Sequence, residues 1–87
     1  MARRDFLVGN AELRGEDEKR WKLLYYISLE GAVYSIKIER VGSDGTLTEE
    51  TGGLTYSHSE AEAWVKMLIK GTVTPLTLHE VVDDLME

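Results

Sequence analysis

The 87-residue sequence contains no cysteine, which excludes a disulfide framework and any chemistry that needs a thiolate. It also lacks a long apolar segment: the longest run, residues 23–27, has five members, whereas a membrane span needs about 18. The N-terminal residues lack the apolar core of a secretory signal peptide. We therefore expect a soluble, cytoplasmic protein.

Basic residues are scarce, since 10 Lys and Arg stand against 16 Asp and Glu, for a formal net charge of −6. The acidic excess lies in residues 23–87, because residues 1–22 are almost balanced. An acidic surface repels phosphate backbones, and the sequence forms no basic stripe. We therefore expect no direct binding to nucleic acid and no membrane partner.

A chain of this length forms one domain with a modest core. No internal repeat and no low-complexity segment divides it. We assign residues 1–87 to a single domain and expect residues 1–4 to be flexible, as chain termini often are.

The first half of the chain has the pattern of strands separated by turn residues. Residues 21–29 and 32–41 carry apolar side chains at alternate positions, as strands with one buried face do. Residues 4–13 also suit a strand, which either breaks or bulges at Gly9-Asn10. This half should also contain a polar loop at residues 15–19 and a tight turn at residues 30–31. A hairpin turn is predicted at residues 42–45 and a polar edge strand at residues 46–51.

The second half contains two helix-start signatures of the same kind. Ser57-His58-Ser59-Glu60 and Thr77-Leu78-His79-Glu80 each place a hydroxyl three residues before a glutamate, the pattern of a capping box. An apolar residue, Tyr56 or Leu76, precedes each box and could pack on the helix as a hydrophobic staple. The resulting predictions are a first helix, an extended connector and a second helix, at residues 58–70, 73–76 and 78–86.

These elements predict an α+β fold: an antiparallel meander of three to four strands, then one long helix packed on the sheet and a short C-terminal helix. The apolar faces of the strands and helices should supply most of the core. Its predicted members are Trp21, Leu23, Tyr25, Ile27, Tyr34, Ile36, Ile38, Trp64, Val65, Leu68, Val81 and Leu85.

The two histidines are the first residues to consider for catalysis, since each lies in the first turn of a predicted helix. Neither has a second metal ligand at a suitable spacing on its own helix, and a helix N-terminus disfavours a charged imidazole. The hydroxyls in the two capping boxes are better explained as caps than as nucleophiles. We predict no catalytic residue, no metal ligand and no cofactor, with a site near His58 and His79 as an alternative.

Aromatic side chains are numerous for so small a core, and not all of them can be buried. Because the strand over residues 21–29 buries one face well, either Tyr25 or Tyr26 should lie outside the core. An exposed aromatic ring beside Leu24 would form an interface patch.

A second candidate surface is acidic and lies on the C-terminal helix. Its carboxylates could bind a basic partner or imitate a nucleic acid. Together with the apolar patch, they complete the candidate interaction surface: Leu24, Tyr26, Glu80, Asp83 and Asp84.

The segment Val73-Thr74-Pro75-Leu76-Thr77-Leu78 follows a serine-rich helix start and a pair of alternating strands. With these features, residues 22–84 resemble a family of small uncharacterised proteins from clostridial and related Gram-positive bacteria. The resemblance implies no catalytic residues, because that family has no assigned function.

The sequence favours a non-enzymatic protein–protein interaction module, either a homodimer or an adaptor for another protein. The surplus of aromatic residues, the small core and the lack of a catalytic set support this interpretation. Two alternatives stay open: an acidic inhibitor that occupies a basic, nucleic-acid-binding partner, and a small-ligand or enzymatic site at the two histidines.

Overall fold

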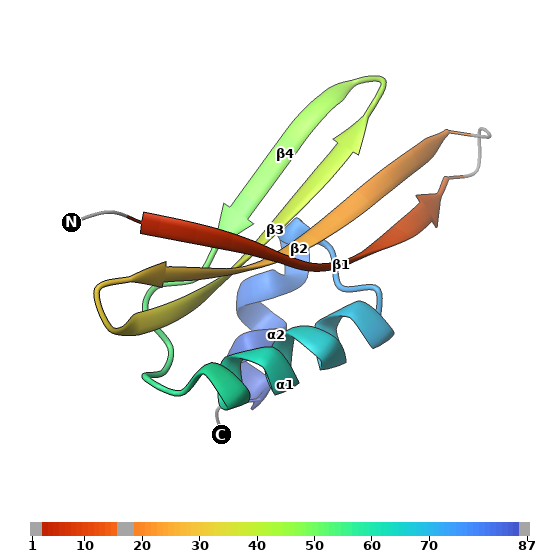
Figure 1. Cartoon of the computed structure of the whole chain (residues 1–87). Coiled ribbons are helices and arrows are strands. Elements are labelled where there is room, and N and C mark those ends of the chain that lie inside the picture. Colours follow the sequence, from red (N-terminus) through yellow and green to blue (C-terminus); the bar gives the residue numbers. More distant parts are fainter. Residues whose placement is uncertain (1–2, 16–18, 86–87) are drawn as a thin grey trace.

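The computed structural model describes residues 3–15 and 19–85 (Figure 1). Four strands form one antiparallel sheet in the order β1-β2-β3-β4, and helices follow them. This confirms the predicted α+β meander, although the helix expected to be long has an ordinary 13 residues. The elements are β1 (Arg3–Arg14), β2 (Arg20–Glu30), β3 (Val33–Gly42), β4 (Gly45–Glu50), α1 (His58–Lys70), the 3₁₀ helix η1 (Pro75–Thr77) and α2 (Leu78–Leu85).

Two predictions fall partly on residues that are not described. Residues 16–18 of the predicted polar loop lie outside the described residues, as do residues 1 and 2 of the segment expected to be flexible. Arg3 and Arg4 belong to β1, where they pair with Glu30 and Leu29 of β2.

Strand β1 is continuous, and its pairing with β2 shifts register between Leu7 and Gly9. Of the two predictions for this segment, the bulge is therefore correct and the break is wrong. Val8 is the extra residue in β1, because it has no partner in β2. Helix α1 approaches β1 at the next residue, Gly9. A Cβ placed on Gly9 would lie only 2.8 Å from Ile69 Cδ1, so glycine permits this close approach.

The two hairpin turns fall where the sequence predicts them. Gly31, between β2 and β3, adopts a φ of 63°, which glycine accommodates readily. Ser43 and Asp44 form the turn between β3 and β4. Strand β4 is an edge strand, as predicted, and β1 forms the opposite edge of the sheet.

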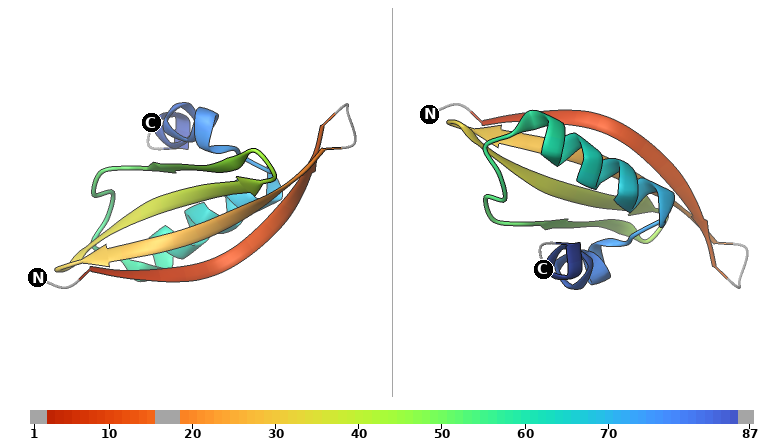
Figure 2. Two further views of the ribbon diagram at one scale, coloured as in Figure 1. Left: turned by 90° about the horizontal axis from the view of Figure 1, so that it is seen from above. Right: turned by 90° about the horizontal axis from the view of Figure 1, so that it is seen from below.

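Helix α1 lies across one face of the sheet, and α2 stands beyond the β4 edge and extends toward the same side (Figures 1 and 2). Helix α1 crosses beneath β1, β2 and β3, while η1 packs against β4. Of the 12 predicted core residues, seven are buried between these layers, which confirms them. Four others are partly buried and pack against the core: Tyr34, Trp64, Val81 and Leu85. The buried hydrophobic residues are Leu23, Tyr25, Ile27, Ile36, Ile38, Ala61, Val65, Leu68, Leu78 and Val82.

Trp21 is the exception among the predicted core residues, because it is only partly buried and lies outside the core cluster. Its ring packs against Gly15 and Gly42, its Nε1 donates to Asp44 Oδ1 at 3.1 Å, and the Arg40 guanidinium lies 5.5 Å from its ring centroid. The strands are longer than the helix that covers them, so this end of the sheet extends past the core (Figure 1).

The first predicted capping box forms only its N-cap hydrogen bond, and the second box does not form. Ser57 Oγ accepts from the Glu60 backbone N–H at 3.3 Å, as predicted, while the Glu60 carboxylate accepts from the Thr55 hydroxyl instead of reaching back to Ser57. Helical structure at the second site begins earlier, because Pro75 occupies the first turn of η1 with its φ already set for a helix. Thr77 therefore ends η1, and the extended connector stops at Thr74.

Neither predicted staple forms. The side chains of Tyr56 and Leu76 are 78% and 77% exposed, so they do not pack on the helices that they precede.

Candidate interaction surface

The sheet has one face that no helix covers among the described residues. Because α1, η1 and α2 all lie on the opposite side, this outer face is open (Figure 2). Side chains on it come from alternate positions of each strand, out of phase with the buried set.

An apolar patch crosses the middle of the outer face, which we define as Leu7, Leu24, Tyr26 and Val41. Leu7 lies directly opposite Tyr26 in the register, and Leu24 follows on the same face of β2. Val41 is diagonal to Leu24, because Val41 is paired with Lys22. Opposed and diagonal neighbours in a sheet lie within side-chain contact distance, so the four residues form one continuous stripe.

A cluster of charged and hydroxyl groups adjoins this patch, which we define as Arg3, Asp5, Ser28, Lys37 and Glu50. Asp5 is its centre: it accepts from Lys37 Nζ at 2.8 Å, from Ser28 Oγ at 2.7 Å and from Arg3 Nε at 3.1 Å. Arg3 also forms an ion pair with Glu50. The cluster thereby joins all four strands through side chains that are far apart in the sequence.

The Lys37 ammonium, through its hydrogen bond, holds the pKa of the Asp5 carboxyl well below its ordinary value, and Ser28 and Arg3 act in the same direction. Lys37 Nζ also lies 4.5 Å from the centroid of the Tyr26 ring, in cation–π geometry. Lys37 therefore connects the charged cluster to the apolar patch and fixes the position of Tyr26.

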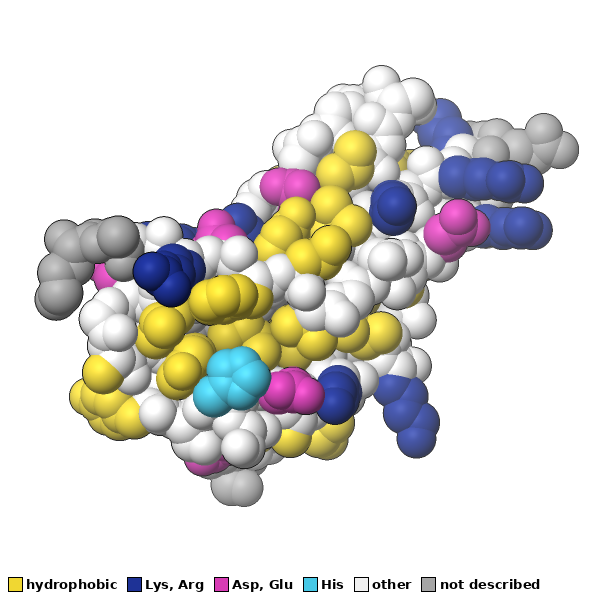
Figure 3. Space-filling model, viewed as in Figure 1, with side chains coloured by type: hydrophobic (Ala, Val, Ile, Leu, Met, Phe, Trp, Pro, Cys, Tyr) yellow, Lys and Arg dark blue, Asp and Glu magenta, His cyan; other side chains and the backbone are white. Residues whose placement is uncertain are grey.

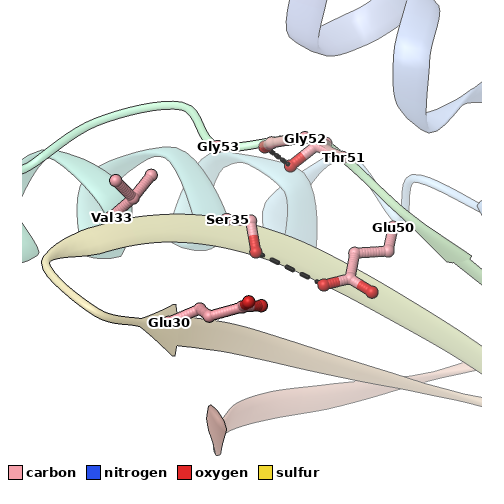
Figure 4. Close-up of a pocket in the computed structure, with 7 residues that line it drawn as sticks. All are labelled: Glu30, Val33, Ser35, Glu50, Thr51, Gly52 and Gly53. Carbon is pink, nitrogen blue, oxygen red and sulfur yellow. Dashed lines mark hydrogen bonds between the residues drawn. The ribbon is translucent and has the colours of Figure 1, made fainter. Parts of the chain in front are cut away.

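A pocket of about 360 Å³ lies at the end of the outer face, where the chain leaves β4 (Figure 4). Glu30, Ser35 and Glu50 line it from the strands, and Ser35 Oγ donates to Glu50 Oε1 at 3.4 Å. Thr51 forms its wall, with a hydroxyl that accepts from the Ile36 backbone N–H at 3.0 Å and donates to the Gly52 carbonyl at 2.8 Å. The carboxylates in the lining make this pocket unfavourable for anions.

The structure separates the predicted interaction residues into two groups. Leu24 and Tyr26 lie together on the outer face, and the buried Tyr25 confirms that only one of the two tyrosines belongs to the core. The other three, Glu80, Asp83 and Asp84, are exposed on α2, whose Leu78 and Val82 pack into the core on the opposite side of the sheet. The acidic residues therefore cannot join the apolar patch in one contact area.

The histidines have different neighbours, and both side chains are more than half exposed. The His58 ring packs edge-on against Tyr34, with centroids 5.5 Å apart, and its Nδ1 is 3.6 Å from Glu62. His79 Nε2 lies 3.1 Å from Glu49 Oε1. Each ring is paired with its own carboxylate on open surface, an arrangement that provides no shared concave site.

Sequence reasoning missed the exposed pair Phe6 and Leu7 on β1. They are 43% and 57% exposed, and they are consecutive residues on an edge strand. The signal was available as the run Phe6-Leu7-Val8, but only the strand order shows that this run borders solvent.

Within residues 3–15 and 19–85, no group of three or more His, Asp or Glu side chains is placed to hold a metal ion. Among the same residues, no helix is both long enough and apolar enough to cross a membrane.

Residues 4–87 match the model of a family of unknown function, DUF6514. No curated protein and no solved structure matches the chain. The resemblance to an uncharacterised family is thus confirmed, and the match extends it to nearly the whole chain.

Proposed function

The chain belongs to the family of unknown function DUF6514, and from its surface we propose that it is a cytoplasmic, non-enzymatic protein–protein interaction module. Its partner is another protein or a second copy of itself. We further propose that relatives occur in clostridial and related Gram-positive bacteria, as the sequence resemblance implies.

The observation that carries this proposal is the apolar patch on the open face of the sheet. An antiparallel sheet with one solvated face normally has polar residues on that face. Here Leu7 is more than half exposed, and Leu24, Tyr26 and Val41 continue the apolar stripe over two more strands. None of the four packs into the core cluster, so burial within the monomer does not explain them.

The charged cluster supports the same function. Aromatic and apolar centres surrounded by polar groups are typical of protein interfaces. Tyr26 is held by Lys37, which is held in turn by Asp5, so the ring is already ordered before a partner arrives. Such preorganisation lowers the entropic cost of association.

The test is the variant Leu24→Lys, which puts a charge in the centre of the patch opposite Glu39. Thr48→Lys is the matched control, because Thr48 is exposed on the same face and flanks Glu39 from the other side. Self-association is measured by sedimentation equilibrium, and partner binding by capture from an extract of the native host followed by titration with the purified partner.

We expect Leu24→Lys to weaken the association by about tenfold or more, the effect of losing one central contact, and Thr48→Lys to leave it unchanged. A wild-type protein that is strictly monomeric and captures no specific partner would refute the proposal. An association that Leu24→Lys and Thr48→Lys affect equally would refute the role of the patch.

A further inference from the structure

We propose that a second copy of this chain pairs with the free edge of β1, antiparallel, so that two four-stranded sheets join into one of eight strands. This inference rests on the proposed function, because it names the partner. The contact is made by β1, whose Leu7 belongs to the apolar patch.

The first support is the difference between the two edges of the sheet. Strand β4 has six residues and η1 packs against it. Strand β1 has 12 residues, and α1 packs against its inner face, but its outer edge pairs with no other strand among the described residues. Edge strands in soluble proteins are normally short or covered, because their unpaired backbone groups bind other strands. Among the described residues, β2 pairs with one edge of β1 and α1 passes beneath it, and no strand lies along its other edge (Figures 1 and 2).

The second support is the pair of exposed side chains on this edge. Phe6 and Leu7 are consecutive, so they point to opposite faces of the sheet. A partner that docked on one face would cover only one of them. A strand placed alongside β1 would cover both, and hydrophobic side chains do gather along the middle of β1 (Figure 3).

The third support is charge complementarity in one particular register. Two copies related by a two-fold axis perpendicular to the sheet must pair outer-face residues with outer-face residues. The bulge at Val8 changes the alternation, so these residues are Arg3, Asp5 and Leu7 before it and Asn10, Glu12 and Arg14 after it.

With Arg3 opposite Glu12 of the second copy, Asp5 lies opposite Asn10, and symmetry repeats both pairs. Two opposite-charge pairs form and no like charges meet. A shift by two residues instead places Arg3 opposite Arg14 and Asp5 opposite Glu12, which are like-charge pairs throughout. The charges on β1 therefore favour the first register over this shifted one.

The same register places the Phe6 ring of one copy opposite Gly9 of the other. Gly9 has no side chain, and Ile69 of α1 packs against it from below. An aromatic ring that covers a cross-strand glycine is a known way to stabilise sheets, and here it would also contact Ile69. Leu7 of both copies would lie beside the two-fold axis, which joins the two apolar patches into one.

The test uses charge reversal in the full chain, measured by sedimentation equilibrium. Glu12→Arg and Arg3→Glu each create two like-charge pairs in the proposed dimer, so each should raise the dimer Kd on the order of tenfold. An equimolar mixture of these two variants should form a heterodimer with near wild-type affinity, because both of its pairs are again of opposite charge. Thr48→Lys adds a charge on β4, at the opposite edge of the sheet, so it is the control and should leave the Kd unchanged.

Circular dichroism and thermal melts establish that each variant is folded, which matters for Arg3→Glu because Arg3 also pairs with Glu50. A monomeric wild-type protein would overturn the inference, as would a dimer that Glu12→Arg does not weaken or a mixture that does not recover affinity. The proposed function would survive these results if Leu24→Lys still abolished binding to another protein.

Discussion

The Tyr25 hydroxyl offers the sharpest test of how the connector between the helices is held to the sheet. Tyr25 is fully buried, and its hydroxyl donates to the backbone carbonyl of Val73 at 2.8 Å. Val73 lies in the connector between α1, which ends at Lys70, and η1, which begins at Pro75. Replacing Tyr25 with Phe removes the donor and leaves the ring in place, so only the hydrogen bond is lost.

The expected cost is about 1–2 kcal/mol of unfolding free energy, because the net worth of a neutral hydrogen bond is about 1 kcal/mol and a buried acceptor left unpaired adds to it. In a domain of this size that corresponds to a fall in Tm of roughly 4–16 °C. Urea unfolding followed by circular dichroism measures the free energy directly. An unchanged m-value would show that the denatured state is not affected.

The matched control is Tyr26→Phe, the same change at the adjacent residue on the outer face. The Tyr26 ring contacts Lys37, and the cation–π contact survives in phenylalanine. We expect a cost below about 0.5 kcal/mol, typical of surface substitutions. Equal effects of the two variants would refute the assignment of Tyr25 as the residue that anchors the connector.

Burial also raises the pKa of Tyr25 to about 12 from its ordinary value of 10.0. Since the folded-state pKa is the higher one, its contribution to stability is complete below pH 10 and is lost as the pH rises from about 10 to 12. Absorbance titration at alkaline pH should show a tyrosine that ionises near pH 12, and Tyr25→Phe should remove that step. The absence of a step near pH 12 in the folded protein would contradict the buried placement.

Three further predictions concern other parts of the fold. Ser57→Ala should cost about 1 kcal/mol of unfolding free energy in urea titrations, because Ser57 caps α1. Thr77→Ala should cost less, because Thr77 does not act as an N-cap. A larger loss for Thr77→Ala than for Ser57→Ala would contradict the observed helix starts. Leu68→Ala should cost about 2–5 kcal/mol in the same assay, because Leu68 is fully buried. Met67 is half exposed, so Met67→Ala should cost less than about 0.5 kcal/mol. Similar losses for the two variants would mean that α1 packs on the sheet through a different face. Asp5→Asn should lower the free energy of unfolding by about 1 kcal/mol at neutral pH, after allowance for solvent screening. Because the folded-state pKa of Asp5 is depressed, this loss of stability relative to wild type should shrink as the pH falls below about 4. A loss that stays constant down to pH 2 would contradict the charged cluster.

The local elements could be predicted from the sequence because their signals are local. Residues 32–41 alternate cleanly, and a cap at Ser57 and a glycine at position 71 bound α1 at both ends. The second helix start could not be placed as well, because two rules compete there. Thr77 suits an N-cap, but Pro75 suits the first helical turn, and the chain takes the earlier start.

The limits of the core could not be predicted, because they depend on the relative lengths of packed elements. Helix α1 has 13 residues, or about 20 Å, whereas β2 has 11 residues, or about 36 Å. Trp21 has the alternation of a core residue but lies at the end of β2 that α1 does not reach. Periodicity identifies the face of a strand and says nothing about how much of that face is covered.

The candidate surface was predicted in the same partial way. Alternation places Leu24 and Tyr26 on one face, whereas the charged cluster depends on pairs such as Asp5 and Lys37, which are 32 residues apart. A contact between residues so far apart in the sequence cannot be predicted from a local pattern. The same holds for Phe6 and Leu7, whose exposure follows from the position of β1 at the edge of the sheet.

The outer face and the β1 edge together favour association over a solvated monomer. The charged cluster could have satisfied its own polar groups at any position on the open face, yet it lies directly against Tyr26 and holds that ring in place. The apolar stripe then runs from Tyr26 to Leu7, at the edge where backbone groups of β1 are free to pair. A surface that served solubility alone would interrupt this stripe with charge at the edge, as edge strands usually do. Charges on β1 instead lie toward its two ends, where in the antiparallel register Arg3 and Glu12 of two copies attract each other and leave the apolar centre free for contact.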